Sequence, residues 1–342
     1  MVGVLKGTSN RSKGAGQLMT MIVLVAIAAG CASALMFASI ISGALISLLL
    51  LYFAPLPLMV AALGWGPLAA TIGGIGAATG LGAIFGLPIC ISFVVMMALP
   101  AWWLGHLALL GRPVASAGPS EGATPAPPAM EWYPIGRLLL WIAAFGTLST
   151  MATLLTLGTD AATITETLRA ALLRVLGPRT AASGDEIQQR IDVALMILPA
   201  AAASSAMTML MLNFWLAARI TATSGRLRRA WPDLKSTELP PMTLAALSAA
   251  IAFCFSGGLF AMLAQTVTAA LLMVYAVIGF AVLHTLTLGL KSRGLWLACS
   301  YTMVVVSGGW LILAMTALGI ADAIFRFRQR FLHRRPPPLP AS

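Results

Sequence analysis

The chain contains 98 consecutive residues, from residue 14 to residue 111, without a single Asp, Glu, Lys or Arg. Soluble domains carry about 25% charged residues, so a run of this length is incompatible with a water-exposed fold. A helix needs roughly 20 apolar residues to cross a bilayer, and this run therefore holds about four crossings. The feature indicates an integral membrane protein with several spans.

Four more charge-free runs follow and extend the same conclusion to nearly the whole chain. They lie at 138–159, 193–218, 239–290 and 294–321. The sequence predicts an all-α, polytopic transmembrane helix bundle with about 8–10 spans. The apolar segments that we distinguish are 18–37, 39–53, 57–84, 87–110, 136–158, 191–218, 242–264, 266–289 and 294–320.

The basic residues give an orientation. They gather at the ends of the apolar segments, and Lys and Arg are typical of cytoplasmic loops. We therefore expect a cytoplasmic N-terminus, a cytoplasmic loop 219–238 and a cytoplasmic C-terminal tail, with 159–190 on the outside. This arrangement needs an even number of crossings. Either segment 294–320 turns back near Ser307-Gly308-Gly309, or one earlier segment does not cross.

The composition also places the protein. Its spans are helical and rich in Ala and Leu, and no organelle-targeting segment is evident. We expect a multi-pass protein of the bacterial inner (plasma) membrane. The net charge of +11 does not indicate nucleic acid, because the positive-inside rule already accounts for it.

A Pro/Gly-rich linker divides the chain into two bundles. Residues 111–135 form this linker, which has the composition of a flexible connector. Four further regions follow from the pattern: a cytoplasmic N-terminal tail 1–17, an N-terminal bundle 18–110, a C-terminal bundle 136–322 and a basic cytoplasmic tail 323–342.

The region 160–177 differs from the spans. Asp160 is a good helix cap, apolar residues then recur at helical spacing, and Gly177-Pro178 stops the pattern. This predicts a short amphipathic helix lying on the membrane surface. A second helix is expected to start near Ser183, with Pro199 bending it at membrane depth.

Most chemical functions lack the residues that they need. None of the ten carboxylates lies at the middle of a predicted span, which disfavours a proton-coupled pump or antiporter. No HExxH, GxSxG or P-loop motif occurs, and the four cysteines form no CxxC pair. The sequence therefore predicts no enzyme, no cofactor, no metal site and no ATP site.

A few polar and aromatic residues within the apolar segments are candidates for ligand binding. Each has a second explanation, because Trp and His anchor helices at the interface and Asn and Gln hydrogen-bond one helix to another. The candidates are Trp102, Trp103, His106, Asn213, Gln265 and His284.

Two arginine clusters are candidates for contact with a partner or with lipid. Basic side chains near a membrane surface are attracted to anionic lipid. The residues are Arg226, Arg228, Arg229, Arg326, Arg328 and Arg330.

Glycines crowd one segment at four-residue spacing. Gly76 and Gly80 form one pair, and Gly82 and Gly86 form another. Such pairs predict close approach of a second helix.

Several short motifs occur in a specific order along the chain. They are Ala54-Pro55-Leu56-Pro57-Leu58, Gly64-Trp65-Gly66, Leu99-Pro100-Ala101-Trp102-Trp103-Leu104-Gly105, Ile197-Leu198-Pro199-Ala200, Leu212-Asn213, Leu239-Pro240, Gly279-Phe280-Ala281-Val282-Leu283-His284, Gly319-Ile320-Ala321-Asp322 and Phe325-Arg326-Phe327-Arg328. In this order the chain resembles the YybS-like family of uncharacterised bacterial polytopic membrane proteins.

The resemblance implies a fold more than an activity. The N-terminal part of that family is similar to the substrate-binding components of energy-coupling-factor vitamin transporters. This implies a compact helical bundle with a small-molecule pocket. No vitamin-specific motif is visible here, and the C-terminal bundle extends beyond a six-helix core.

Two hypotheses follow. The protein binds a small-molecule ligand or helps to transport it, with energy supplied by a partner ATPase. Alternatively, it is a membrane scaffold that recruits a cytoplasmic protein through its basic loop and tail.

Overall fold

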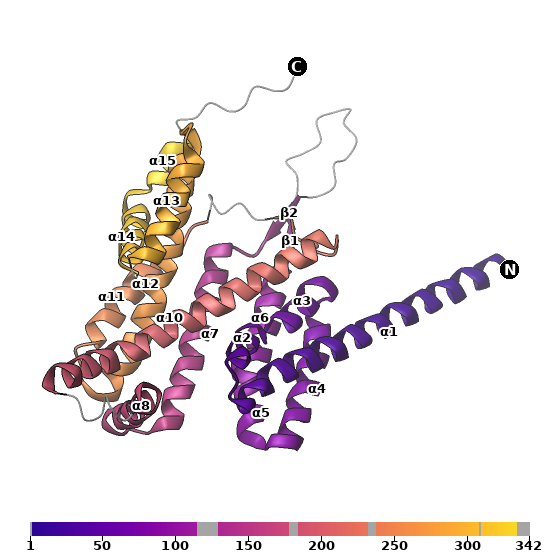
Figure 1. Cartoon of the computed structure of the whole chain (residues 1–342). Coiled ribbons are helices and arrows are strands. Elements are labelled where there is room, and N and C mark those ends of the chain that lie inside the picture. The colour runs from indigo at the N-terminus through magenta and orange to yellow at the C-terminus, as the bar shows by residue number, and fades with distance from the viewer. Residues whose placement is uncertain (1, 115–128, 178–183, 232–236, 308, 334–342) are drawn as a thin grey trace. The chain divides into compact units, whose positions relative to one another are not determined.

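The computed structural model describes residues 2–114, 129–177, 184–231, 237–307 and 309–333. These residues are almost entirely helical, which confirms the all-α class (Figure 1). Seven described helical segments are long and apolar enough to cross a membrane, and the protein is therefore a multi-pass membrane protein. They are Gly16–Ser42, Leu45–Trp65, Pro67–Phe85, Leu87–Ala108, Ile135–Leu157, Asp185–Thr223 and Gly258–Leu286.

The chain forms two compact units. Unit 1 contains Met1–Tyr133 and Thr208–Trp231, and unit 2 contains Pro134–Met207 and Pro232–Ser342. The first stretch of unit 1 ends at Tyr133. The C-terminal half of helix α10 (Asp185–Thr223), however, belongs to unit 1, although the sequence placed it in the C-terminal bundle.

Unit 1 is built from short and long helices with one small strand pair. Its helices are α1 (Val2–Ala38), α2 (Leu45–Phe53), α3 (Leu56–Trp65), α4 (Pro67–Phe85), α5 (Leu87–Phe93) and α6 (Leu99–Ala108), together with the end of α10. A 3-10 turn at Ser39–Ser42 and a π-helical turn at Val94–Ala98 complete the helical part.

Glycine and proline set the helix boundaries in unit 1. Gly66 adopts a φ of 98°, which favours glycine, and Pro67 then starts α4 at a position where its missing N–H costs nothing. The expected single segment 57–84 is therefore two helices. Its first part joins α2 across the proline break to form the broken span Leu45–Trp65.

The ends of the expected flexible linker pair with each other. Strands β1 (Gly111–Val114) and β2 (Ala129–Trp132) form an antiparallel ladder, with Gly111 opposite Trp132. The residues between them, 115–128, lie outside the described residues.

Close backbone contact between helices in unit 1 involves Gly73, outside the predicted pairs, although Gly82 of the second pair also lies against α5, with Cys90 Cβ 3.2 Å from a Cβ built on it. A Cβ on Gly73 would lie 2.4 Å from the Ala26 carbonyl oxygen, so the backbones of α4 and α1 touch there. Gly76 and Gly80 are exposed, and nothing in the described part of the chain lies within 4 Å of a Cβ built on either.

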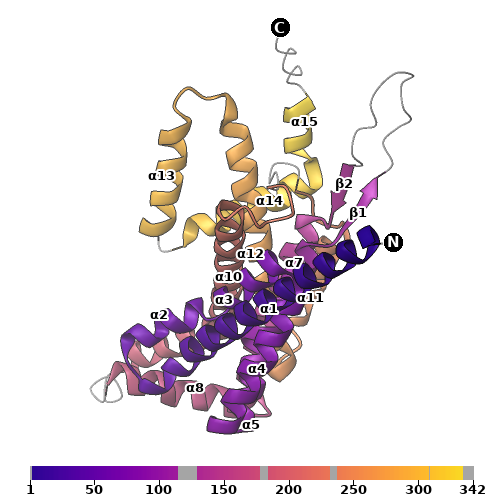
Figure 2. The same ribbon diagram turned by 90° about the vertical axis from the view of Figure 1, so that its right-hand side faces the viewer.

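Unit 2 contains the remaining helices. They are α7 (Ile135–Leu157), α8 (Ala161–Leu176), the start of α10, α11 (Met242–Phe253), α12 (Gly258–Leu286), α13 (Arg293–Val306), α14 (Trp310–Phe325) and α15 (Phe327–His333). Helix α14 packs against α12 (Figure 2).

Two breaks in unit 2 differ in how well the sequence located them. The segments 242–264 and 266–289 are divided at Cys254–Gly257 instead of near 265, because Gly257 and Gly258 both adopt positive φ. Segment 294–320 contains two helices, since α13 ends at Val306 and α14 begins at Trp310, close to the position at which one of the two alternatives placed a turn.

Helix α8 begins where the sequence indicated. The Asp160 side chain accepts a hydrogen bond from the Thr163 backbone N–H at 3.0 Å, which is the geometry of an N-cap. The Thr163 hydroxyl donates to the same carboxylate at 2.7 Å. Gly177, with a φ of 89°, ends the helix.

This cap predicts a pH dependence. The hydrogen bonds from the backbone and then the hydroxyl of Thr163 lower the pKa of Asp160 below its ordinary 3.8. A lowered pKa means that the cap stabilises α8 above that value and is lost as the pH falls through the pKa of the folded protein. Amide exchange of residues 161–165, corrected for its intrinsic pH dependence, should accelerate in acid. An Asp160→Asn variant should not show this change, and equal acceleration in both proteins would contradict the prediction.

Candidate functional site

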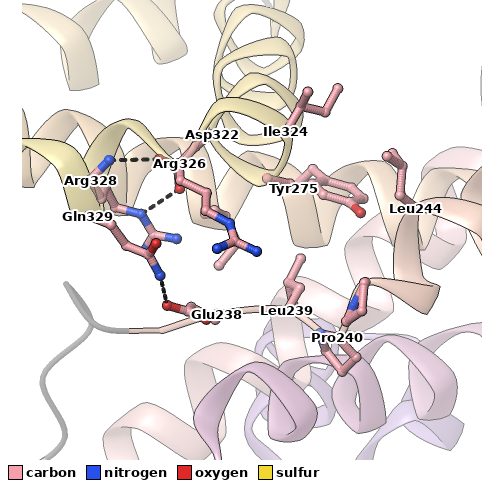
Figure 3. Close-up of a pocket in the computed structure, with 13 residues that line it drawn as sticks. Glu238, Leu239, Pro240, Leu244, Tyr275, Asp322, Ile324, Arg326, Arg328 and Gln329 are labelled. Carbon is pink, nitrogen blue, oxygen red and sulfur yellow. Dashed lines mark hydrogen bonds and ion pairs between the residues drawn. The ribbon is translucent and has the colours of Figure 1, made fainter.

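Unit 2 contains a cavity of about 480 Å³. Its walls come from the segment before α11, the middle of α12 and the junction of α14 with α15 (Figure 3). Much of the lining is apolar and consists of Leu239, Pro240, Pro241, Leu244, Tyr275, Ile278, Ala323 and Ile324.

Arg326 occupies the junction between α14 and α15. It ends α14 by donating its backbone N–H to the Asp322 carbonyl at 2.8 Å. Its φ of 54° is positive, and it is the one residue other than glycine with this conformation among the described residues. Such backbone strain is concentrated at functional sites. Figure 3 shows the guanidinium between this junction and the Glu238–Leu239 segment.

A buried ion pair fixes the direction of α15. Arg328 Nε donates to Asp322 Oδ2 at 2.6 Å, and the Arg328 backbone N–H donates to Oδ1 at 3.0 Å. The two side chains are only 8% and 4% exposed. The sequence suggested that Arg328 contacts lipid or a partner at the surface. In the structure Arg328 is buried instead, because it pairs with the Asp322 carboxylate inside the protein.

Glu238 is held on the opposite side of the cavity. Gln329 Nε2 donates to Glu238 Oε1, which joins the segment before α11 to α15. The Glu238 backbone lies directly on α7, since a Cβ on Gly136 would be 1.9 Å from the Glu238 carbonyl oxygen. The position of Glu238 is thus set by its backbone as well as by its side chain.

The charges around the cavity are of two kinds. Asp322 and Arg328 compensate each other. Arg326 makes no ion pair within the described ranges, and Glu238 bonds to a neutral amide. Arg326 and Glu238 are both exposed, which leaves one positive and one negative group at the edge of an apolar cavity.

Three of the predicted ligand residues cluster on α6 in unit 1. The rings of Trp102 and Trp103 are 5.5 Å apart, and His106 stacks on Trp102 at 6.1 Å. All three are half-buried. No described cavity contains them, so their packing alone does not distinguish a ligand role from an interface role.

Asn213 joins helices in unit 1. Its Nδ2 donates to the Tyr52 carbonyl at 2.7 Å and to the Met209 carbonyl at 2.8 Å. The Tyr52 carbonyl needs a donor because the helix breaks around Pro55. At the same helix break, the Ser33 hydroxyl donates a hydrogen bond to the Ala54 carbonyl at 2.6 Å.

Replacing Asn213 by Leu should destabilise unit 1 by about 1 kcal/mol, a value between the average and the maximum for hydrogen bonds between membrane helices. The effect is modest because Asn213 Oδ1 is itself buried without a partner among the described residues, and its removal offsets part of the loss. Thermal unfolding in detergent measures the change. Asn213→Asp should cost more, since a carboxylate cannot donate to Tyr52. Unchanged stability in both variants would contradict a joining role.

The other two predicted ligand residues lie in unit 2, away from the larger cavity. Gln265 lines a smaller cavity of about 300 Å³ with Asp192 and Pro199. His284 Nε2 lies 2.8 Å from the Tyr301 hydroxyl on α13. Within the described ranges, no three His, Cys, Asp or Glu side chains are grouped so as to hold a metal ion.

The arginines of the basic loop are partly engaged within unit 1. The Arg226 guanidinium lies 4.4 Å from the centre of the Trp65 ring, and Arg229 Nη1 donates to the Ala108 carbonyl at 3.3 Å. Burial lowers the pKa of Arg229. Arg228 is exposed, and so is Arg330 in unit 2.

Of the residues that line the larger cavity, the sequence singled out only Arg326 and Arg328, and Tyr275 and Glu238 are among those that it missed. Tyr275 is 1% exposed and lies in an apolar run, where no neighbouring residue marks it as part of a binding site. Glu238 directly precedes Leu239-Pro240-Pro241, and a charged residue at the start of a proline-rich entry to a helix is a signal that was available.

Comparison with known proteins adds no family assignment. No protein-family model matches the chain, and no curated protein or solved structure matches it significantly.

Proposed function

We propose that this membrane protein binds a small molecule in the cavity of unit 2. The observation that carries the proposal is the Arg326 guanidinium, which makes no ion pair within the described ranges and reaches into an apolar-lined cavity (Figure 3). The cavity volume of about 480 Å³ is within the usual range for ligand sites. A strained backbone at the same residue supports a functional role.

The proposal includes assistance in transport. The sequence contains no P-loop for ATP, so energy for movement of the ligand would come from a partner ATPase. The resemblance to the YybS-like family, with its likeness to transporter substrate-binding components, supports the same class of function. We propose no catalytic activity for the chain.

The proposed location is a bacterial inner membrane, with both termini in the cytoplasm. The hydrogen bond between Glu238 and Gln329 supports part of this topology, because it requires the segment before α11 and helix α15 to lie on the same side. The structure has two shorter apolar helices besides the seven long spans, α11 and α14, and the even number of crossings that the basic tail requires is reached if one of the two crosses.

A scaffold role is the second candidate. It is favoured by the exposed Arg330 on α15 and the exposed Arg228 in the basic loop. It is weakened by the internal ion pair of Arg328, which removes one of the three tail arginines that we expected at the surface.

Native mass spectrometry of gently extracted protein tests the proposal. We expect a bound small molecule of defined mass on the wild-type chain. Arg326→Gln should lose it, whereas Arg330→Gln is the matched control and should keep it, because Arg330 is exposed on α15 and does not line the cavity. A wild-type spectrum with a stoichiometric protein partner and no small molecule would refute binding and favour the scaffold.

A further inference from the structure

Two charged residues that form no ion pair within the described ranges line the cavity and indicate the chemistry of its ligand. This inference rests on the proposed function. Arg326 and Glu238 line the same cavity of about 480 Å³, yet they form no ion pair within 4.0 Å of each other. Two exposed side chains of opposite charge gain little free energy by pairing in water, so both groups stay available to a ligand.

The backbone holds Arg326 in place. Its N–H closes the end of α14 on the Asp322 carbonyl, and its left-handed conformation turns the chain into α15. The buried pair of Asp322 with Arg328 then clamps the following turn. Arg326 is the residue between these two anchors, so its Cα has little freedom to move towards Glu238.

Glu238 is anchored independently. Its carbonyl oxygen lies against Gly136 of α7, and one carboxylate oxygen accepts from Gln329. Within the described ranges, the other oxygen, Oε2, accepts no hydrogen bond, and Glu238 lines the same cavity as Arg326. The cavity edge thus offers both an acceptor and a donor to a ligand.

A ligand with a single charge would satisfy only one of these groups. A simple anion would bond to Arg326 but would also lie close to the Glu238 carboxylate, which carries the same sign. A simple cation would have the reverse difficulty. The apolar part of the lining that remains accessible comes from Leu239, Pro241 and Leu244, which suits an apolar substituent.

We propose that the cavity takes a small zwitterion with an apolar side group. Its carboxylate accepts hydrogen bonds from the Arg326 guanidinium, and its ammonium donates to the Glu238 carboxylate. The apolar group lies against Leu239 and Leu244.

Matched probes test the inference. The zwitterions are leucine, phenylalanine and leucyl-leucine, the anions are their N-acetyl derivatives, and the cations are their amides. Binding to the detergent-solubilised full chain is measured by titration calorimetry and by the shift in thermal midpoint. We expect at least one zwitterion to bind more tightly than both of its singly charged relatives, by about tenfold or more, the loss that one charge-assisted hydrogen bond predicts.

The two charged residues should control opposite preferences. Glu238→Gln should remove the advantage of a zwitterion over its N-acetyl derivative, since the ammonium then has no anionic acceptor. Arg326→Gln should remove the advantage over the amide. Arg326→Gly is a second variant that relieves the positive φ, so lost binding there is not explained by misfolding. Arg330→Gln should leave every preference unchanged.

The possible failures are distinguishable. If an N-acetyl derivative binds as well as its parent, or if native mass spectrometry finds a bound molecule that is not a zwitterion, the inference fails while small-molecule binding stands. If no zwitterion binds and the wild-type chain carries no small molecule, both the inference and the proposed function fail.

Discussion

Replacing Gly319 by leucine should separate α14 from α12 and unfold much of unit 2. A Cβ on Gly319 would lie 1.9 Å from the Tyr275 carbonyl oxygen, and a Cβ on Gly279 would lie 1.9 Å from the Met315 carbonyl oxygen. The two backbones are therefore in direct contact, and no side-chain movement makes room. We expect a loss of more than about 3 kcal/mol, beyond the usual range for overpacking.

Thermal or denaturant unfolding in detergent measures this effect. Gly294→Leu is the control, because nothing in the described residues lies within 4 Å of a Cβ at that position. The Gly319 variant should also lose any ligand, since its clash falls on Tyr275, which lines the cavity. Equal stability of the two variants would show that the contact between α12 and α14 is not as close as described.

Replacing Asp322 by alanine should destabilise the protein by about 3–5 kcal/mol, the cost of breaking a buried ion pair on one side. The Asp322 carboxylate accepts from both the side chain and the backbone of Arg328. Its removal leaves a buried guanidinium without its carboxylate and releases the first turn of α15.

The double variant Asp322→Leu with Arg328→Met separates this explanation from a simple loss of packing. Replacing both charges by apolar groups of similar size is often close to neutral. The double variant should therefore be more stable than Asp322→Ala alone when their unfolding midpoints are compared. If the double variant is the less stable of the two, the ion pair itself contributes net stability and the argument from an uncompensated charge is wrong.

The sequence predicted the class of fold better than its details. Uncharged runs identify membrane helices reliably because burying a charge in lipid is costly. A helix break near Gly309 was one of the two alternatives that the sequence left open. The breaks at Gly66 and at Gly257 were not anticipated, although Gly66-Pro67 and Gly257-Gly258 were visible signals, because apolar residues continue on both sides and conceal the interruption.

The candidate site was predictable only in part. Arg326 was singled out from the sequence, but for contact with lipid or a partner. The cavity depends on the approach of Glu238, Tyr275 and Asp322, which are far apart along the chain. The periodic pattern of apolar residues within a helix does not indicate which distant residues come together in the fold. Asn213 illustrates the same limit, since its role follows from a helix break near Pro55 in a different part of unit 1.

Arg326 has a role in the cavity through its side chain and a role in the fold through its backbone. The residue whose side chain reaches the cavity is also the residue whose backbone turns the chain into α15. The Asp322 carbonyl and the buried pair of Asp322 with Arg328 already fix this turn, so a molecule that holds the guanidinium would add a third contact to it. Ligand binding and the stability of the first turn of α15 are then linked, because anything that binds only the folded turn stabilises it.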